Sequence, residues 1–439
     1  MKNMKRIYIS VILTACTCMT AAAQQRLHLS QQECRRMAVE ASEDMEQAEN
    51  RLRQAELDRK IAATAALPNL SASGTVSYMM PDMDMMGMEL LMRGTYMAGL
   101  SLSQPIYTGG KISAARRLSR IGEQASEEQL RMARMDVMAE ADNAYWTYIS
   151  VRSKVRMMER YAAQLDSIYR MTSTTVRAGM ATENDLLRVD AKRSEIEYQL
   201  QRTRNGADLC RLSLCRLVGA GADTEIIPTD TLIAAEQPRR LDDDIELRPE
   251  VRLLQRQIDA QRQQIRMTRA DMLPTVGLSL GYTYYGNIKM RTMVDVGGGM
   301  MFPYTQEFRD GIGIGMVAVK IPIFHWGEAR KKVRKARYEL RNAELEMQKN
   351  RELMGLQVQQ AIRNLTDGYR LVDAAQRAFA QSEENLRVMR NRYEARLSPL
   401  TDLLDAESQW QQSQSNLIEA QTQFRIYETE YLRVTGRLE

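Results

Sequence analysis

Histidine and cysteine are scarce in this chain, with two His and five Cys among 439 residues. His28 and His325 are isolated, so neither belongs to a cluster with metal-ligand spacing. The sequence also contains no nucleophile triad and no glycine-rich phosphate loop. We therefore predict neither an enzyme nor a bound cofactor.

Long apolar runs are absent beyond Thr20, where no segment approaches 18 consecutive apolar residues. This excludes a transmembrane helix there. A charged fraction of 27% and a mean hydropathy of −0.44 are too polar for a helical inner-membrane transporter. A hydrophobic fraction of 44% is too high for a disordered chain. Any entry into a membrane must therefore use β-strands.

A strong imbalance of charge is missing too. The 61 Lys and Arg residues and the 56 Asp and Glu residues give a net charge of +5. Residues of opposite charge are intermixed along the chain and are not gathered in blocks. Because nucleic-acid-binding proteins usually carry a basic stripe, we expect no nucleic-acid partner.

The beginning of the chain has a basic start, an apolar stretch from Ile7 to Thr20 and the residues Ala-Ala-Ala-Gln. This order is typical of a cleaved secretory signal peptide, which we place at residues 1–23. The segment 13–16, which ends in Cys16, also matches a lipobox, so lipidation of Cys16 is the alternative. Both alternatives carry the protein out of the cytoplasm.

An internal repeat is the most informative pattern. Equivalent residues recur 217 positions apart (322 minus 105, for example): Pro105 and Pro322, Ala178 and Ala395, Asp185 and Asp402, Gly219 and Gly436. This spacing indicates two copies of one unit, at 24–219 and 248–439, with a linker at 220–247. Upstream, Pro68 and Pro274 are 206 apart, so the second copy has eleven extra residues between its two prolines (217 minus 206).

Each copy is expected to contain a helix, two strands, a long helix and a return helix. Residues 111–175 contain no Pro and one Gly, and their apolar residues follow heptads from Ala141 onward. A continuous helix of this length would measure about 98 Å. The other two helices are each roughly half as long, so we expect them to stack end to end beside it.

The strands are predicted at about 69–78 and 96–107 in the first copy and at about 275–285 and 312–324 in the second. Apolar residues such as Val276, Leu278 and Leu280 alternate with glycine, serine or threonine. This alternation is typical of a barrel wall with lipid outside and water inside. Because membrane barrels start at about eight strands, four strands per chain must be completed by other chains.

This doubled order of elements resembles the TolC-like outer-membrane efflux protein family, from Leu27 to Gly436. The motifs that carry the resemblance are Leu-Pro at 67–68 and 273–274, Arg-Pro-Glu at 248–250, and the turn segments 176–187 and 392–406. The resemblance implies a fold that is mainly α with a small β part. It implies a homotrimer with a 12-stranded β-barrel in the outer membrane of a Gram-negative bacterium, continued by a long α-helical coiled-coil tunnel in the periplasm.

The resemblance also implies partners and a mechanism. The trimer would contact outer-membrane lipid and dock, through a periplasmic adaptor protein, on an inner-membrane pump that supplies the energy. Ala178, Gly179, Ala395 and Arg396 would form the helix tips that meet the adaptor. The channel itself would be passive.

The pore and gate candidates lie beside these tips. Asp402 and Asp405 match the family's acidic entrance positions, and a ring of carboxylates attracts cations. Asp185 and Tyr393 match positions that latch the closed state, whereas Ser398 stands where the family has a latch Arg. The alternative for the Asp residues is a solvated helix start favoured by the helix dipole.

A methionine-rich segment at 79–92 contains Met79, Met80, Met83, Met85, Met86, Met88 and Met92. Thioethers favour Cu(I) or Ag(I), so a metal site is one interpretation, and a flexible apolar loop is the preferred one. Cys210 and Cys215 are placed on different sides of one helix and do not pair easily. A bond from Cys34 to either of them is left open.

The predicted function is that of an outer-membrane channel in a tripartite efflux system. The alternatives are an exit duct for type I protein or peptide secretion and a Cu/Ag efflux channel. A structural coiled-coil protein without a channel would explain the helices but not the strand pairs.

Overall fold

The computed structural model describes residues 26–85, 88–230, 235–238, 241–295, 297 and 301–438. The predicted signal peptide at 1–23 and Cys16 lie outside these residues. The chain divides into two compact units. The helical unit combines Met1–Asn50, Glu128–Arg252 and Gln348–Glu439, and the sheet unit combines Arg51–Glu127 and Leu253–Met347.

The helices repeat in length as well as in order. They are α2 (Gln31–Ala41), α3 (Glu43–Thr64), α4 (Lys111–Arg177), α5 (Glu183–Leu217), α6 (Pro249–Ala270), α7 (Glu328–Glu394) and α8 (Leu400–Val434). Both α4 and α7 have 67 residues, and both α5 and α8 have 35. A helix of 67 residues is about 100 Å long. The equal lengths confirm the tandem architecture that the constant offset predicts.

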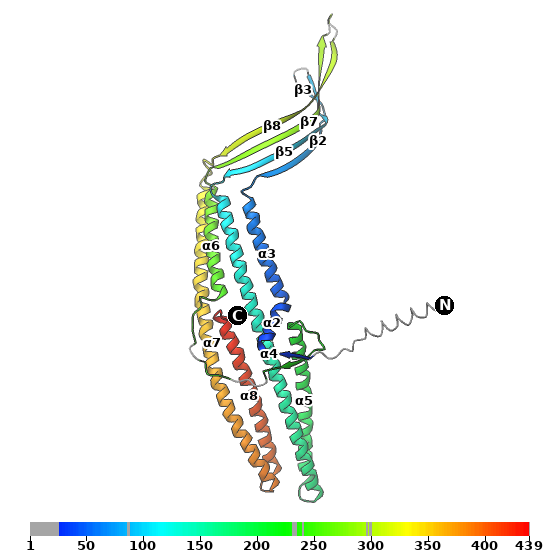
Figure 1. Cartoon of the computed structure of the whole chain (residues 1–439), viewed down its shortest axis with the longest axis vertical. Coiled ribbons are helices and arrows are strands. Elements are labelled where there is room, and N and C mark those ends of the chain that lie inside the picture. Colours follow the sequence, from blue (N-terminus) through cyan, green and yellow to red (C-terminus); the bar gives the residue numbers. More distant parts are fainter. Residues whose placement is uncertain are drawn as a thin grey trace, which may run out of the picture. The chain divides into compact units, whose positions relative to one another are not determined.

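The sheet unit is built on four antiparallel strands in the order β2 (Asn69–Tyr78), β5 (Arg93–Tyr107), β7 (Thr275–Asp295) and β8 (Met301–Lys320). In the register, Asn69 faces Ser103, Tyr107 faces Val276 and Thr275 faces Lys320. All four strands therefore meet their helices α3, α4, α6 and α7 at the same end of the sheet, as Figure 1 shows.

Some predicted strand bounds in the second copy were wrong. Backbone pairing between β7 and β8 continues past a bulge at 285–288 and reaches Asp295, ten residues beyond the predicted end at 285. At the other end β8 stops at Lys320 instead of 324, because Pro322 has no N–H to donate. In the first copy β5 begins at Arg93, three residues before the predicted start.

Part of the methionine-rich segment forms two short paired strands where the sequence suggested a loop. Its strands are β3 (Met83–Met85) and β4 (Met88–Leu91), with Met85 opposite Met88. The β4 strand also pairs with β7, where Leu90 faces Met290. The extra length of β7 offers free backbone groups to β4, and pairing satisfies both.

A small parallel sheet in the helical unit was missed from the sequence. It pairs β1 (Arg26–Leu29) with β6 (Glu225–Pro228), which lies in the predicted linker 220–247. Leu29 and Ile226 of these strands are fully buried and pack in one cluster with Cys34, Ala141 and Leu214. The two strands therefore attach the ends of the first copy to α4.

A buried carboxylate ties three helices of the helical unit together. Asp142 of α4 is fully buried and accepts hydrogen bonds from Arg35 Nε of α2 at 2.8 Å and from Thr429 Oγ1 of α8 at 2.7 Å. Gln31 Nε2 donates a third at 2.9 Å. A charge buried without such partners would be strongly unfavourable, so the pairing specifies how these helices pack.

The cysteines and the hydropathy of the helices give two further findings. Cys34, Cys210 and Cys215 are all free, so the disulfide that the sequence left open is not formed. Among the described residues, no helix combines the length and the apolar character needed to cross a membrane.

Candidate functional site

The first candidate tip is the turn between α4 and α5. Gly179 has a φ of 71°, and the N–H of Met180 bonds to the carbonyl of Thr175 at 2.9 Å. This six-residue closure is a Schellman motif, in which a left-handed residue ends the helix. Ala178 directly precedes Gly179, and its N–H bonds to the carbonyl of Thr174 at 3.1 Å.

The second candidate tip, between α7 and α8, has the same closure with a different residue. Arg396 occupies the position of Gly179 and has a φ of 59°, and the N–H of Leu397 bonds to the carbonyl of Arg392 at 2.7 Å. A residue with a Cβ is strained in this region, so the turn stores conformational energy that its counterpart does not. The hydroxyl of Ser398 is buried, and no described residue forms a hydrogen bond with it.

The structure brings the two turns together within the helical unit. The guanidinium of Arg396 contacts the sulfur of Met180. The hydroxyl of Tyr393 lies 3.2 Å from Thr172 Oγ1 of α4, whose side chain is fully buried. Apolar residues from all four helices form one cluster beneath them: Tyr161, Leu165, Ile168, Val189, Ile196, Leu386, Leu400, Leu403, Ala406 and Trp410.

The three candidate Asp residues differ in their surroundings. Asp185 belongs to a capping box: its backbone N–H donates to Thr182 Oγ1 at 3.2 Å, and its carboxylate accepts from that hydroxyl at 2.8 Å and from the Thr182 N–H at 3.3 Å. These bonds satisfy donors at the start of α5. A helix start therefore accounts for this carboxylate.

Neither Asp402 nor Asp405 belongs to a capping box, although Asp402 lies in the first turn of α8, where the helix dipole favours a carboxylate. The residue at the position of Thr182 is Pro399, which makes no side-chain cap. Both carboxylates are exposed, and neither has an ion pair or a hydrogen bond with another described residue. The two copies thus place equivalent Asp residues, Asp185 and Asp402, in different chemical settings.

A buried ion pair near the second turn was missed from the sequence. Glu407 of α8 is fully buried, and Arg390 Nη2 of α7 donates to its carboxylate at 2.9 Å. Burial raises the pKa of Glu407, and the Arg390 guanidinium opposes that rise. The sequence does carry one sign of this burial, because Glu407 lies on the apolar stripe of α8, one turn after Leu403.

The described residues contain no group of three or more His, Cys, Asp and Glu side chains that could hold a metal ion. Methionine thioethers are not among these ligand types, so the methionine-rich segment is described separately. Met79, Met80 and Met83 are exposed, Met88 is half-buried, and Met86 lies outside the described residues. The helix tips and the methionine hairpin belong to different units, so they are two separate candidate sites.

The fold defines a class: a chain of two helix–strand–strand–helix units whose long helices end in paired turns. A family model described as outer membrane efflux protein matches residues 34–220 and 241–437. Because these matches cover most of the chain, the protein belongs to the outer membrane efflux protein family. The function of an outer-membrane efflux channel and the predicted family are both confirmed by this result.

Similar curated proteins agree with the family. Protein CyaE of Bordetella pertussis is 23% identical over 348 residues, which are 77% of this chain and 70% of the relative. The alkaline protease secretion protein AprF of Pseudomonas aeruginosa is 22% identical over 261 residues, which are 58% of this chain and 51% of the relative.

Solved structures share the fold over almost the whole chain. CusC matches with a TM-score of 0.76 at 15% identity, covering 92% of each chain. The outer membrane protein VceC of Vibrio cholerae matches at 0.73 with 18% identity, covering 92% of this chain and 96% of its own. The open-state MtrE outer membrane channel of Neisseria gonorrhoeae matches at 0.74 with 17% identity, covering 96% and 94%. At such low identities, these structural similarities show a shared fold and nothing more.

Proposed function

We propose that three copies of the chain form one outer-membrane channel that passively conducts substrates from an inner-membrane pump and a periplasmic adaptor to the cell exterior. The observation that carries this proposal is the row of four long strands, β2, β5, β7 and β8, which ends in two open edges. Among the described strands, β2 pairs only with β5 along its length, and β8 only with β7. An unpaired strand edge favours pairing with another chain, and three copies of the four long strands supply twelve strands.

The exposed surface of the sheet supports a place in lipid. Apolar side chains that would be buried in a soluble protein are exposed on one face of it, including Leu70, Val76, Val317 and Val319. Such a surface is stable against lipid chains or a protein partner but not in water. The outer membrane of a Gram-negative bacterium, with the helices in the periplasm, is the proposed location.

The helix tips are proposed as the entrance. Three copies of Asp402 and Asp405 would place six free carboxylates around one opening, where they would favour cations. Ala178, Gly179 and the strained Arg396 turn, with Ala395 beside it, would present the surface for the adaptor. Tyr393, through Thr172, would hold the two hairpins of one chain together in the closed state.

A deletion strain tests this function. Its susceptibility to detergents, dyes, antibiotics, Cu and Ag is compared with that of the parent and of a strain complemented with the wild-type gene. Hypersensitivity to several amphiphiles, restored by complementation, is the expected result. Recovery of the protein outside the outer-membrane fraction would refute the proposal.

Secretion is the second candidate, favoured by the similarity to a protein named for alkaline protease secretion. It predicts unchanged susceptibility and the loss of one or more proteins from the culture medium, measured by mass spectrometry of the supernatant. Sensitivity confined to Cu and Ag would instead support the third candidate, a metal-efflux channel that uses the methionine hairpin.

A further inference from the structure

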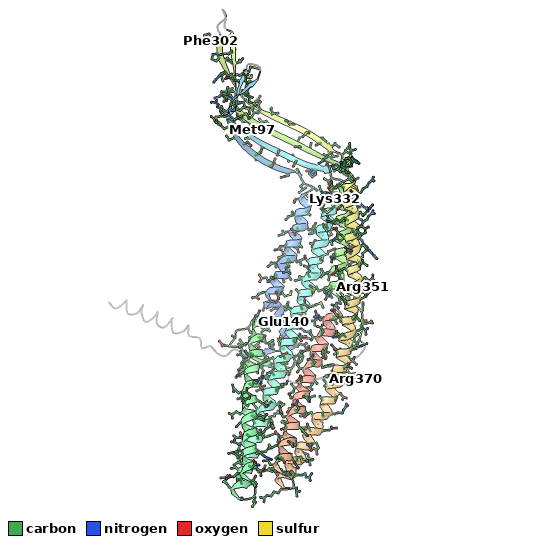
Figure 2. All side chains as sticks on the ribbon, turned by 180° about the vertical axis from the view of Figure 1, so that it is seen from behind. Met97, Glu140, Phe302, Lys332, Arg351 and Arg370 are labelled. Carbon is green, nitrogen blue, oxygen red and sulfur yellow. The ribbon has the colours of Figure 1, made fainter. Side chains whose placement is uncertain are left out.

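Four helix segments of the sheet unit meet the sheet at one end, although they are far apart in the sequence. They are the end of α3 with its connector (59–68), the start of α4 (111–120), the end of α6 with its connector (262–274) and the start of α7 (328–341). We call them the basic helix ends. Figure 1 shows all four beside the strand ends, and Figure 2 marks Lys332 on one of them.

Their charge is strongly one-sided. They contain 16 Lys and Arg residues and three acidic residues, Asp271, Glu328 and Glu339. The whole chain has 61 and 56, so the remainder has 45 basic and 53 acidic residues. The charges are intermixed along the sequence, but the fold gathers basic segments that the sequence separates.

Local helix stability explains only part of this charge, because the helix dipole favours basic residues at the ends of α3 and α6 but not at the starts of α4 and α7. A helix N-terminus carries a partial positive charge, so basic residues in the first turns of α4 and α7 are unfavourable. Yet the first turn of α4 has no acidic residue, and α7 has only Glu328 there. The basic residues at the starts of α4 and α7 therefore oppose the helix dipole, which points to a partner outside the chain.

Several of these side chains are also unpaired. Arg330, Arg334 and Arg337 recur at helical spacing along one stripe of α7 and are all exposed. Within the described part of the chain none of the three has an ion pair, whereas Lys332 pairs with Glu328 at 2.6 Å. We call these three residues the arginine stripe.

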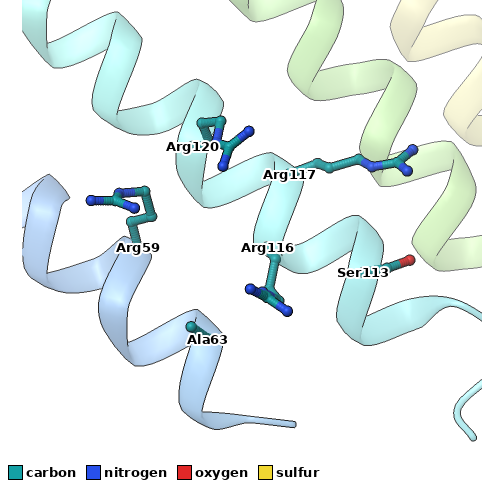
Figure 3. A pocket seen from close by; sticks show the side chains of 6 residues that line it. All are labelled: Arg59, Ala63, Ser113, Arg116, Arg117 and Arg120. Carbon is teal, nitrogen blue, oxygen red and sulfur yellow. The ribbon is translucent and has the colours of Figure 1, made fainter.

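A second group of guanidinium side chains lines a hollow of about 250 Å³ between α3 and α4 (Figure 3). Arg59 of α3 faces Arg116 and Arg120 of α4 across it, and Arg117 also lines it. Arg59 pairs with Glu123 at 2.6 Å, while no described residue forms an ion pair with the three α4 arginines. Guanidinium groups held apart from carboxylates fit a phosphate oxygen bidentately.

An apolar segment lies beside the basic helix ends. The connector from β8 to α7 contains Ile323, Phe324 and Trp326, which are 91%, 68% and 84% exposed. A cleft of about 720 Å³ is lined by Ile323 and Phe324 together with Lys320 and Lys332. Its two carboxylates, Asp271 and Glu328, are paired with Lys111 and Lys332. Apolar and cationic groups side by side match a molecule with an acyl chain and an anionic headgroup.

We propose that the basic helix ends bind the phosphate headgroups of anionic phospholipids in the membrane leaflet that faces the helices. This inference rests on the proposed function, which puts the sheet in the outer membrane. Basic residues next to a membrane-embedded segment are attracted to anionic headgroups. A nucleic acid is also anionic, but it has no acyl chain that would cover the exposed apolar connector and strands.

Tryptophan fluorescence offers a direct test, because Trp326 lies at the site while Trp146 and Trp410 are buried in the helical unit. The full-length protein in an uncharged maltoside detergent is titrated with phosphatidylglycerol or phosphatidylcholine that carries brominated acyl chains. Bromine quenches tryptophan only on close approach. Phosphatidylglycerol is expected to quench at lower concentration than phosphatidylcholine, and a Trp326→Phe variant should lose the quenching.

The decisive variant removes the arginine stripe by the changes Arg330→Gln, Arg334→Gln and Arg337→Gln. Each basic side chain near an anionic surface contributes about fivefold in binding, so the half-quenching concentration of phosphatidylglycerol should rise about 100-fold at low salt. The phosphatidylcholine curve should not move. A matched control, R156Q/R188Q/R202Q, removes three exposed charges from the helical unit and should behave as wild type.

Three outcomes would overturn the inference: equal quenching by the two lipids, no shift in the arginine-stripe variant, or an equal shift in the control. The same preparations are checked for outer-membrane recovery and for conductance in a lipid bilayer. A protein that inserts and conducts but shows no headgroup preference refutes the lipid site alone. A protein that neither fractionates with the outer membrane nor conducts refutes the proposed function.

Discussion

The left-handed turn at Arg396 leads to a quantitative prediction, because the chain contains its own reference at Gly179. The two residues have φ angles of 59° and 71° and end helices of equal length. An L-residue in this conformation costs about 1 kcal/mol relative to glycine. The exposed contact of Arg396 with Met180 returns only a few tenths of that amount. We expect the Arg396→Gly variant to be more stable by roughly 0.5–1 kcal/mol.

The reciprocal change supplies the control. An added Cβ at Gly179 would meet nothing within 4 Å, so Gly179→Ala tests the backbone conformation without a steric clash. It should destabilise the protein by about 1 kcal/mol. For a helical region of this size, 1 kcal/mol corresponds to about 2–4 °C in Tm.

Circular dichroism melting in detergent measures both variants. The account predicts a Tm that rises in Arg396→Gly, falls in Gly179→Ala and returns near the wild-type value in the double variant. A lower Tm in Arg396→Gly would refute the reasoning, since it would mean that contacts of the arginine outweigh its backbone strain.

Three further predictions concern the helical unit. Asp185→Ala should lose about 1 kcal/mol of stability through its capping box, whereas Asp402→Ala should melt within about 0.5 kcal/mol of wild type, both by thermal denaturation. Burial raises the pKa of Glu407 above its unfolded value of about 4.3. The stability that protonated Glu407 contributes is therefore fully present below about pH 4.3 and is lost as the pH rises through the folded pKa. The Glu407→Gln variant should not show this loss in thermal melts recorded over a series of pH values. Burial raises the pKa of Cys34 to about 12, so a thiol reagent at pH 8 should label the half-buried Cys210 first, by mass spectrometry.

The repeat could be predicted from the sequence because an offset is independent of tertiary contacts. The 217-residue spacing predicted two equal units, and the heptads predicted the long helices. The fully buried Ala141 and Leu165 lie on the predicted stripe. Regular, long elements carry many repeats of one pattern, so errors at single positions do not change the result.

Short or paired features were harder to predict. The four-residue strands β1 and β6 are too short for a periodic signal, and each forms only because the other is present. The far ends of β7 and β8 lack strict alternation and depend on their mutual pairing. The basic helix ends come from four distant segments, so only the topology of the sheet brings their charges together.

The candidate Asp residues show what a repeat can hide. Asp185 and Asp402 are equivalent by offset, and both were expected to act at the tips. The difference lies three residues earlier, where Thr182 caps its helix and Pro399 does not. These two positions distinguish the capping carboxylate from the free one, because only Thr has a hydroxyl that accepts the bond.

The most direct test of the central claim is the conductance of the purified protein in a planar lipid bilayer, with ion selectivity measured across a KCl gradient. The account predicts a passive pore that prefers K⁺ and loses roughly threefold or more of that preference in Asp402→Asn/Asp405→Asn, with Asp185→Asn unchanged. Absence of any pore would contradict the channel, and an unchanged preference in the double variant would contradict the carboxylate entrance.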